Sequence, residues 1–475
     1  MDIAERSKGL ALRFNLRGAK KSILDRRVSE REQKMSILSA SPEDEDRSNA
    51  TRLKNVSDEY IAQMYSIIEI NRAVIPELAA RKEGETLKAK DEILQALTPE
   101  EREISRGYLD QFLGNLGSIL DSGGPRSSSE VTVKMPNRGA GAAISHLIMQ
   151  TAYRAKAGPP DYLLRNSLLV SAISTFEVLF GQLARAVSSV NSSALSDSEH
   201  TFTIDDLAKF ESLDDAREYL IEKRVSSLLR DSVDVWEKWL KRQTGGVSMQ
   251  ALPVSWSLVR ESFARRNLLV HTGGVVNHLY IAVVAKLGLP ESATVRPGER
   301  IDVDAEYLDR VLQELLALGH TLICAVGVKL YVKNRDIYLR AAINAARDFS
   351  FWHADRASRV VCSYLLTNKL NRRDEMMTKV RQWVAIKEVE GLGSIRSELE
   401  AWDTSGLDPS IAHCKNILLD DLEEGARVVE VLISQGDLSR FEVAFDPLYK
   451  KLARPVFREN QGEGESKELA KEDGV

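Results

Sequence analysis

Apolar residues recur every three or four positions along most of this 475-residue chain, and stretches that alternate between apolar and polar residues are few. This spacing matches the helical period of about 3.6 residues, whereas a half-buried strand repeats about every two residues. The 13 prolines and the 6% aromatic content fit long helices, and no βαβ unit can be recognised. The pattern therefore predicts an all-α fold.

The most regular apolar pattern lies in the middle of the chain, between residues 155 and 332. Proline, serine, threonine and aspartate residues stand where helices should begin, and paired glycines stand where helices should end. We expect a self-contained bundle of four or five helices in this region. Its helices are predicted at about 160–187, 212–243, 254–272 and 304–330.

The part of the chain before this bundle is less regular. Residues 1–55 are predicted to be a basic, flexible leader that ends in a polar linker. Residues 56–154 form a predicted N-terminal helical region, in which Pro76 should kink or stop the first helix. A second helix should begin at Thr98 and Pro99, and a loop rich in Gly, Ser and Pro should follow at 121–141.

Shorter helical patterns follow the bundle and look paired. They are expected to form a C-terminal domain of helical hairpins at 333–458, and no fixed repeat length supports a true solenoid. Residues 459–475 contain six acidic residues and two lysines, which predicts an acidic, disordered tail. The predicted pieces of the C-terminal domain are 337–347, 356–370, 374–388 and 422–434.

Cysteine usage and hydropathy favour a cytoplasmic protein. The three cysteines, Cys324, Cys362 and Cys414, are far apart and odd in number, which argues against a disulfide framework. The N-terminus has no apolar run of the kind a signal peptide needs. The most apolar stretch, 322–332, is interrupted by Lys329 and is shorter than the roughly 20 residues of a membrane span. We therefore expect no membrane association.

The net charge of −5 excludes a generally basic protein that coats nucleic acid. The charge is uneven, because residues 1–34 contain ten Lys or Arg and five Asp or Glu. This basic leader is a candidate for contact with RNA phosphates, but such segments are more often solvated tails.

One short motif carries residues suited to catalysis. The segment Arg265-Arg266-Asn267-Leu-Leu-Val-His271-Thr272-Gly-Gly closes the predicted helix 254–272. An Arg-x4-His spacing alone has little specificity. Its setting adds more, because the pair lies at the end of a capped amphipathic helix directly before a double glycine.

This segment, together with the upstream helix RNSLLVSAISTFEVLFGQLARAV, resembles the HEPN superfamily of four- to five-helix domains. The resemblance covers residues 155–332. It implies a metal-independent ribonuclease site built on Arg266 and His271, with RNA as substrate, no cofactor and no metal. It also implies a homodimer in which two copies of the motif face each other across a cleft.

The helical geometry limits how these two residues can cooperate. At about 100° per residue, Asn267 and His271 share one face, whereas Arg266 and His271 are about 140° apart. Arg266 must therefore wrap around on its long side chain, or the helix must loosen before Gly273, or the partner group must come from a second chain.

Each candidate has a chemical role. His271 is suited to proton transfer because an imidazole titrates near neutral pH, and Arg266 is suited to the scissile phosphate because guanidinium matches phosphate oxygens. Asn267 would orient His271 or bind substrate, and Arg265 and Thr272 are further candidates for substrate binding. Glu177, a carboxylate within the long apolar helix, resembles the acidic residue that some HEPN families add to the site.

Simpler interpretations stand beside these roles. His271 in the last helical turn would also be a favourable C-terminal cation, with Arg265 and Arg266 as its solvated neighbours. Glu177 would then be an ordinary salt-bridge residue. The adjacent His413 and Cys414 lack the further ligands of a zinc site, so we interpret them as ordinary helix content.

The leading hypothesis is an RNA endonuclease that acts as a dimer and is controlled by its flanking helices or by a regulatory protein partner. HEPN domains joined to extra modules resemble toxins and antiviral-defence effectors, which implies a role in host defence. The alternative is a non-catalytic HEPN scaffold that binds a nucleotide or a partner protein.

Overall fold

The computed structural model describes residues 42–78, 160–191, 209–289 and 295–452, with a few single residues between 95 and 207. This part of the chain is all-α, as predicted, and its only β pairing is an isolated bridge between Val275 and Arg300. Predictions for residues 1–41, for nearly all of the helix that begins at Thr98 and Pro99, for the loop 121–141 and for the tail 459–475 lie outside the described residues.

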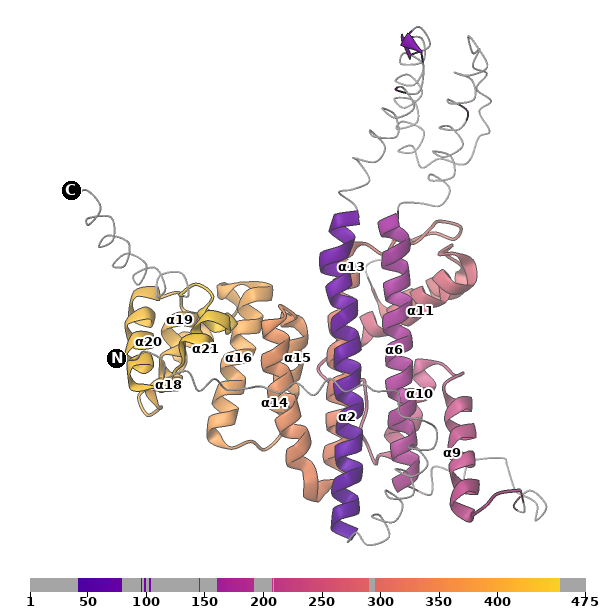
Figure 1. The fold of residues 1–475 in the computed structure, drawn as a ribbon, viewed down its shortest axis with the longest axis horizontal. Helices are drawn as coiled ribbons and strands as arrows, with labels where there is room; N and C mark the ends of the chain where they lie inside the picture. Colours follow the sequence, from indigo (N-terminus) through magenta and orange to yellow (C-terminus); the bar gives the residue numbers. More distant parts are fainter. Residues whose placement is uncertain are drawn as a thin grey trace, which may run out of the picture.

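Three long helices lie side by side at the centre of the molecule: α2 (Pro42–Glu69), α6 (Pro160–Val190) and α13 (Ala305–Leu330) (Figure 1). Helix α13 contacts both of the others and is the most buried of the three. The predicted starts of two of them are confirmed: α6 begins at Pro160, and the Asp304 side chain caps α13 by accepting the backbone N–H of Tyr307.

Helix α2 begins earlier than predicted. Residues 42–55 were expected to be linker, but they are helical, and Ala50 and Leu53 are buried in the central core. The acidic residues Glu43, Asp44 and Glu45, which suggested a solvated segment, occupy the first helical turn. Negative side chains are favourable there because the helix dipole is positive at its N-terminus.

The disturbance predicted at Pro76 takes the form of a π-helical turn. Helix α2 passes into η1 (Ile70–Val74), where the backbone N–H of Ile75 bonds to the carbonyl of Ile70. Proline has no N–H to donate, and a wider turn is one way in which a helix accommodates it. The chain stays helical to residue 78.

Four helices cover one flank of the long helices: α9 (Leu213–Leu228), α10 (Val233–Gln243), α11 (Trp256–Thr272) and α12 (His278–Leu287). The predicted cap of α9 is confirmed, since the Ser212 side chain accepts the backbone N–H of Asp215. The single helix predicted at 212–243 is wrong, because a turn at 229–232 divides it into α9 and α10. Helix α12 was missed, because its sequence HLYIAVVAKL is almost uniformly apolar and has no clear helical stripe. Its start is marked by Asn277, which accepts the N–H of Tyr280.

The central core crosses the predicted boundary at residue 332. Helices α14 (Arg335–Phe351) and α15 (Asp355–Leu365) pack on α13, and their buried side chains belong to the same apolar cluster as those of α2 and α6. The bundle predicted at 155–332 is therefore not self-contained. Helix α13 packs against α2 and α6 and also against α14 and α15. A local sequence pattern does not reveal these additional contacts.

The remaining helices form a separate C-terminal layer with two small apolar clusters of its own. Helix α16 (Arg372–Glu390) packs against α15, as the prediction of helical hairpins requires. The prediction gave no helix bounds between residues 391 and 421, although it interpreted His413 and Cys414 as helix content, and it had no helix after 434. The further elements are η3 (Val332–Asn334), η4 (Leu392–Ser394), α17 (Arg396–Ala401), α18 (Pro409–Ala412), α19 (Cys414–Leu418), α20 (Leu422–Gln435), α21 (Arg440–Phe445) and η5 (Pro447–Tyr449).

Two helices are apolar over a longer stretch than the run 322–332 that the sequence analysis recognised. Helix α13 and residues Asp161–Val190 of α6 both have the length and composition of a membrane span. The most apolar window of α13 is 89% buried inside the protein. A core helix passes the same test, so these two helices are weak evidence for a membrane.

A close approach between α13 and α14 provides a test of this packing. A Cβ atom added at Gly327 would lie 2.2 Å from the ring of Tyr338, which is fully buried and donates its hydroxyl to the carbonyl of Ala50 at 2.9 Å. We expect Gly327→Ala to lower the free energy of unfolding by about 2 kcal/mol, because a well-packed core resists an added methyl group. Urea unfolding measures the change.

The matched control is Gly393→Ala, since a Cβ at Gly393 would meet open space. This substitution should leave the unfolding free energy nearly unchanged. Equal stability of the two variants would contradict the packing of Tyr338 against Gly327.

Candidate active site

A groove of about 480 Å³ opens between α6, α11, α12 and the turn that joins α9 to α10. Four of the residues singled out in the sequence line it: Glu177 from α6, and Arg266, Asn267 and His271 from α11. Residues 89 positions apart in the sequence thus meet in one place.

Arg266 is held by two neighbours in this groove. One terminal nitrogen donates to Glu177 Oε1 at 2.5 Å, and the other donates to Asn267 Oδ1 at 3.1 Å. The side chains of Arg266 and Glu177 are 21% and 27% exposed. The Arg266 Nε atom is buried and has no hydrogen-bond partner in the described part of the chain. The guanidinium is therefore oriented by two of its five N–H groups.

The structure excludes one of the three ways in which Arg266 and His271 could cooperate. Helix α11 stays regular to Thr272 and ends at Gly273, whose φ of +61° belongs to the left-handed region. The predicted loosening before Gly273 does not occur. Arg266 instead reaches the groove with its long side chain, so one chain brings both residues to the same groove.

His271 lies in the last turn of α11 and is exposed. No hydrogen-bond partner of its imidazole is found among the described residues. Asn267 was expected to orient His271, but its side-chain oxygen contacts Arg266. His271 is therefore open to solvent and to any molecule that enters the groove.

Arg265 does not belong to the groove, contrary to the prediction that it is a solvated or substrate-binding residue. It is only 5% exposed. Its Nε donates to Glu261 Oε1 at 2.7 Å, one terminal nitrogen donates to the carbonyl of Asp302 at 2.7 Å, and its guanidinium lies 3.7 Å from the centre of the Tyr307 ring. Arg265 thus ties α11 to α13 and to the segment before it.

Two buried tyrosines complete this network around Glu261. Tyr280 of α12 and Tyr307 of α13 donate their hydroxyls to the two Glu261 oxygens, each at 2.5 Å. Burial, followed by the negative charge of Glu261, raises the pKa of both tyrosines above the ordinary value. Burial alone would lower the pKa of Arg265, but Tyr307 and Glu261 outweigh this effect and raise it. Both tyrosines therefore stay protonated and Arg265 stays charged.

Thr272 is also absent from the groove lining. Its hydroxyl lies 2.9 Å from the carbonyl of Leu268 and 2.8 Å from that of Val275. These contacts give it a role in the end of α11, so the expected substrate contact from Thr272 is not supported.

The groove is also lined by charged residues that the sequence analysis did not single out. Arg260 of α11 donates to Asp234 of α10 at 2.6 Å, and the α9–α10 turn adds Arg230 and Asp231. Arg260 precedes His271 by 11 positions, which is about three helical turns and puts the two residues on one face. That spacing was readable in the sequence, whereas the contribution of the α9–α10 turn was not.

Residues with metal-binding side chains do not gather here. Within the described ranges, no group of three or more His, Cys, Asp or Glu side chains could hold a metal ion. His413, adjacent to Cys414, uses its ring nitrogens on Tyr449 Oη at 2.9 Å and on the carbonyl of Pro409 at 3.0 Å. These contacts agree with the interpretation of His413 as ordinary helix content.

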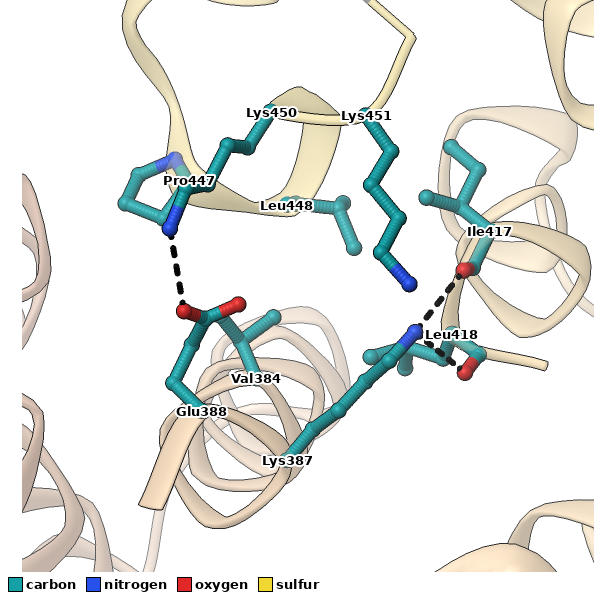
Figure 2. Close-up of a pocket in the computed structure, with 9 residues that line it drawn as sticks. All are labelled: Val384, Lys387, Glu388, Ile417, Leu418, Pro447, Leu448, Lys450 and Lys451. Carbon is teal, nitrogen blue, oxygen red and sulfur yellow. Dashed lines mark hydrogen bonds and ion pairs between the residues drawn. The ribbon is translucent and has the colours of Figure 1, made fainter. Parts of the chain in front are cut away.

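A second hollow lies in the C-terminal layer (Figure 2). Its cavity volume is only about 30 Å³, close to the volume of one water molecule. Lys387 crosses it to bond the carbonyls of Ile417 and Leu418, and Lys450 pairs with Glu388 at 3.1 Å. These lysines join α16 to the C-terminal helices and leave no room for a substrate.

Comparison with protein families, curated proteins and solved structures finds no match to this chain.

The neighbouring arginines provide a test of these assignments. We expect Arg265→Ala to lower the free energy of unfolding by about 3 kcal/mol or more, because it leaves Glu261 buried without its cation. Arg266→Ala should cost less than about 1 kcal/mol, because its ion pair is partly solvated. Denaturant unfolding monitored by circular dichroism measures both, and equal losses would contradict the different surroundings of the two arginines.

Proposed function

We propose that this protein is a metal-independent RNA endonuclease of the HEPN type. The observation that carries the proposal is the groove in which Arg266 and His271 of one helix meet, with Arg266 held by Glu177 from another. The burial of the adjacent Arg265 agrees with this assignment. Of the two neighbouring arginines, only Arg266 lines the groove and can bind a phosphate there.

The chemistry follows from these side chains. In RNA, attack of the ribose 2′-oxygen on the adjacent phosphorus breaks the bond to the 5′-oxygen and leaves a cyclic phosphate. The exposed imidazole of His271 takes the proton of the 2′-hydroxyl, and the resulting imidazolium gives a proton to the leaving 5′-oxygen, directly or through water. Arg266 binds the phosphate and stabilises its developing negative charge.

Glu177 and Asn267 position Arg266 in this scheme. Each bonds a different terminal nitrogen of the guanidinium, which limits the rotation of the long side chain before substrate arrives. A catalytic group held in place loses less freedom in the transition state. The second N–H groups of the two terminal nitrogens remain for the phosphate oxygens.

A homodimer and a role in toxin or antiviral-defence systems belong to the same proposal, and we place its action in the cytoplasm. Val178 and Val270, the neighbours of Glu177 and His271 in sequence, are 56% and 53% exposed. Exposed apolar side chains beside a groove fit a contact with a second copy of the chain. A regulatory protein partner would act on the helices outside the groove.

The alternative of a non-catalytic scaffold that binds a nucleotide or a partner protein is favoured by the charge of the groove. Its three arginines, Arg230, Arg260 and Arg266, are balanced by three carboxylates, Glu177, Asp231 and Asp234. A groove without excess positive charge attracts a polyanion less strongly than a basic one. This alternative predicts that the protein binds a nucleotide or a partner protein and does not cleave RNA.

The deciding experiment incubates purified protein with single-stranded RNA in EDTA. Wild-type protein should cleave it, and His271→Ala or Arg266→Ala should reduce the rate by roughly 100-fold or more, because each removes a group that acts on the reacting atoms. Light scattering of the active protein gives its oligomeric state, and a strictly monomeric active enzyme would contradict the dimer.

Matched controls are His278→Ala and Arg340→Ala, which alter exposed residues outside the groove. Both should retain full activity. The nuclease proposal fails if wild-type protein does not cleave RNA or if the two groove variants cleave as fast as the controls.

The positioning role of Glu177 has its own test. Glu177→Ala should lower kcat by roughly 10- to 100-fold, because Arg266 loses its main anchor and samples other conformations. Glu177→Gln should restore part of kcat, since the amide oxygen still accepts from Arg266. Steady-state kinetics separates kcat from KM, and identical kcat values for both variants and wild type would exclude this role.

A further inference from the structure

A groove larger than the candidate active site lies between α2 and α14, and the two share no lining residue. Its volume is about 560 Å³, within the range of small-molecule sites. The two helices are far apart in the sequence, and α13 contributes the buried His320. The groove is therefore a product of tertiary packing.

Aromatic rings form part of the groove. Tyr65 of α2 lies against Trp352, with ring centres 4.4 Å apart and planes tilted by 47°. Phe349 lies 5.7 Å from Trp352, also tilted. All three side chains line the groove, and tilted rings of this kind offer electron-rich faces that attract cations.

Carboxylates stand on both sides of the groove. Asp58 on α2 pairs with Lys54, and Asp348 on α14 accepts from Arg347 at 3.2 Å. The Arg347–Asp348 pair is about half exposed, with side chains 48% and 41% accessible, and such surface pairs are weak. The Lys54–Asp58 pair is also solvated, with side chains 33% and 48% accessible, so each carboxylate can exchange its present partner for another cation.

The remaining polar residue on α13 adds no positive charge. His320 Nδ1 lies 2.8 Å from Ser57 Oγ, and its Nε2 lies 3.6 Å from Cys324 Sγ. Burial lowers the pKa of His320 to about 4, with a smaller contribution from Lys54. His320 is therefore neutral at physiological pH, and the lining holds two aspartates against one lysine.

We propose that this groove binds an organic ammonium ion with an alkyl body, such as a di- or polyamine, between Asp58, Asp348 and the aromatic rings of Tyr65 and Trp352. The ammonium groups pair with the carboxylates, and the methylene groups lie against the rings. A bare metal ion would use the carboxylates alone and would leave the aromatic part of the groove empty. This assignment is independent of the proposed nuclease activity.

Isothermal titration calorimetry of the full chain, freed of RNA, with spermidine tests the proposal. Wild-type protein should show saturable binding at one site. Asp348→Asn and Trp352→Leu should each weaken it by about tenfold, as expected for the loss of a close charge or of a cation–π face. Asp437→Asn, which removes an exposed carboxylate outside the groove, is the control and should bind like wild type.

Circular dichroism checks that each variant is folded, and Asp348→Asn carries the test if Trp352→Leu is unstable, because its side chain keeps the same shape. The proposal is overturned if spermidine does not bind, if both Asp348→Asn and the control bind like wild type, or if Mg²⁺ displaces spermidine at equal concentration.

Discussion

The buried ion pair between Arg265 and Glu261 is the constraint on which the candidate site depends. Together with the hydroxyls of Tyr280 and Tyr307, it joins α11 to α12 and α13. A buried pair of this kind tolerates little rearrangement, because a separated charge would stay in a low-dielectric interior. The rotation of α11 about its axis is thereby fixed, and with it the direction in which Arg266, Asn267 and His271 point.

The long helices provide the rigid frame behind this pair. Helix α13 is buried along most of its length and holds α2 and α6 on one side and α14 and α15 on another. Glu177 is carried by α6, and its position opposite Arg266 is therefore as rigid as the core. The same frame creates the larger groove, because α2 and α14 both pack on α13 and the groove lies between them.

Local signals predicted much of the fold. Helices α6, α9, α11 and α13 were located by their apolar period and their capping residues, which act within a few positions. The start of α2 was missed because acidic residues suit both a solvated linker and a helix N-terminus. Helix α12 was missed because it is apolar on nearly every side. The predicted domain boundary at residue 332 was wrong because α14 and α15 bury their side chains against α13. The local sequence of α13 does not show which later helices pack on it.

The sequence by itself determined that this protein is helical and that α11 carries an Arg, an Asn and a His near a glycine stop. Arg265 and Arg266 are chemically identical neighbours, separated by about 100° on the helix. Only the tertiary structure decided that the first is enclosed by Glu261 and Tyr307 while the second meets Glu177 at the groove. The physical reason is that burial and charge pairing depend on partners brought from distant parts of the chain, and no local pattern encodes their positions.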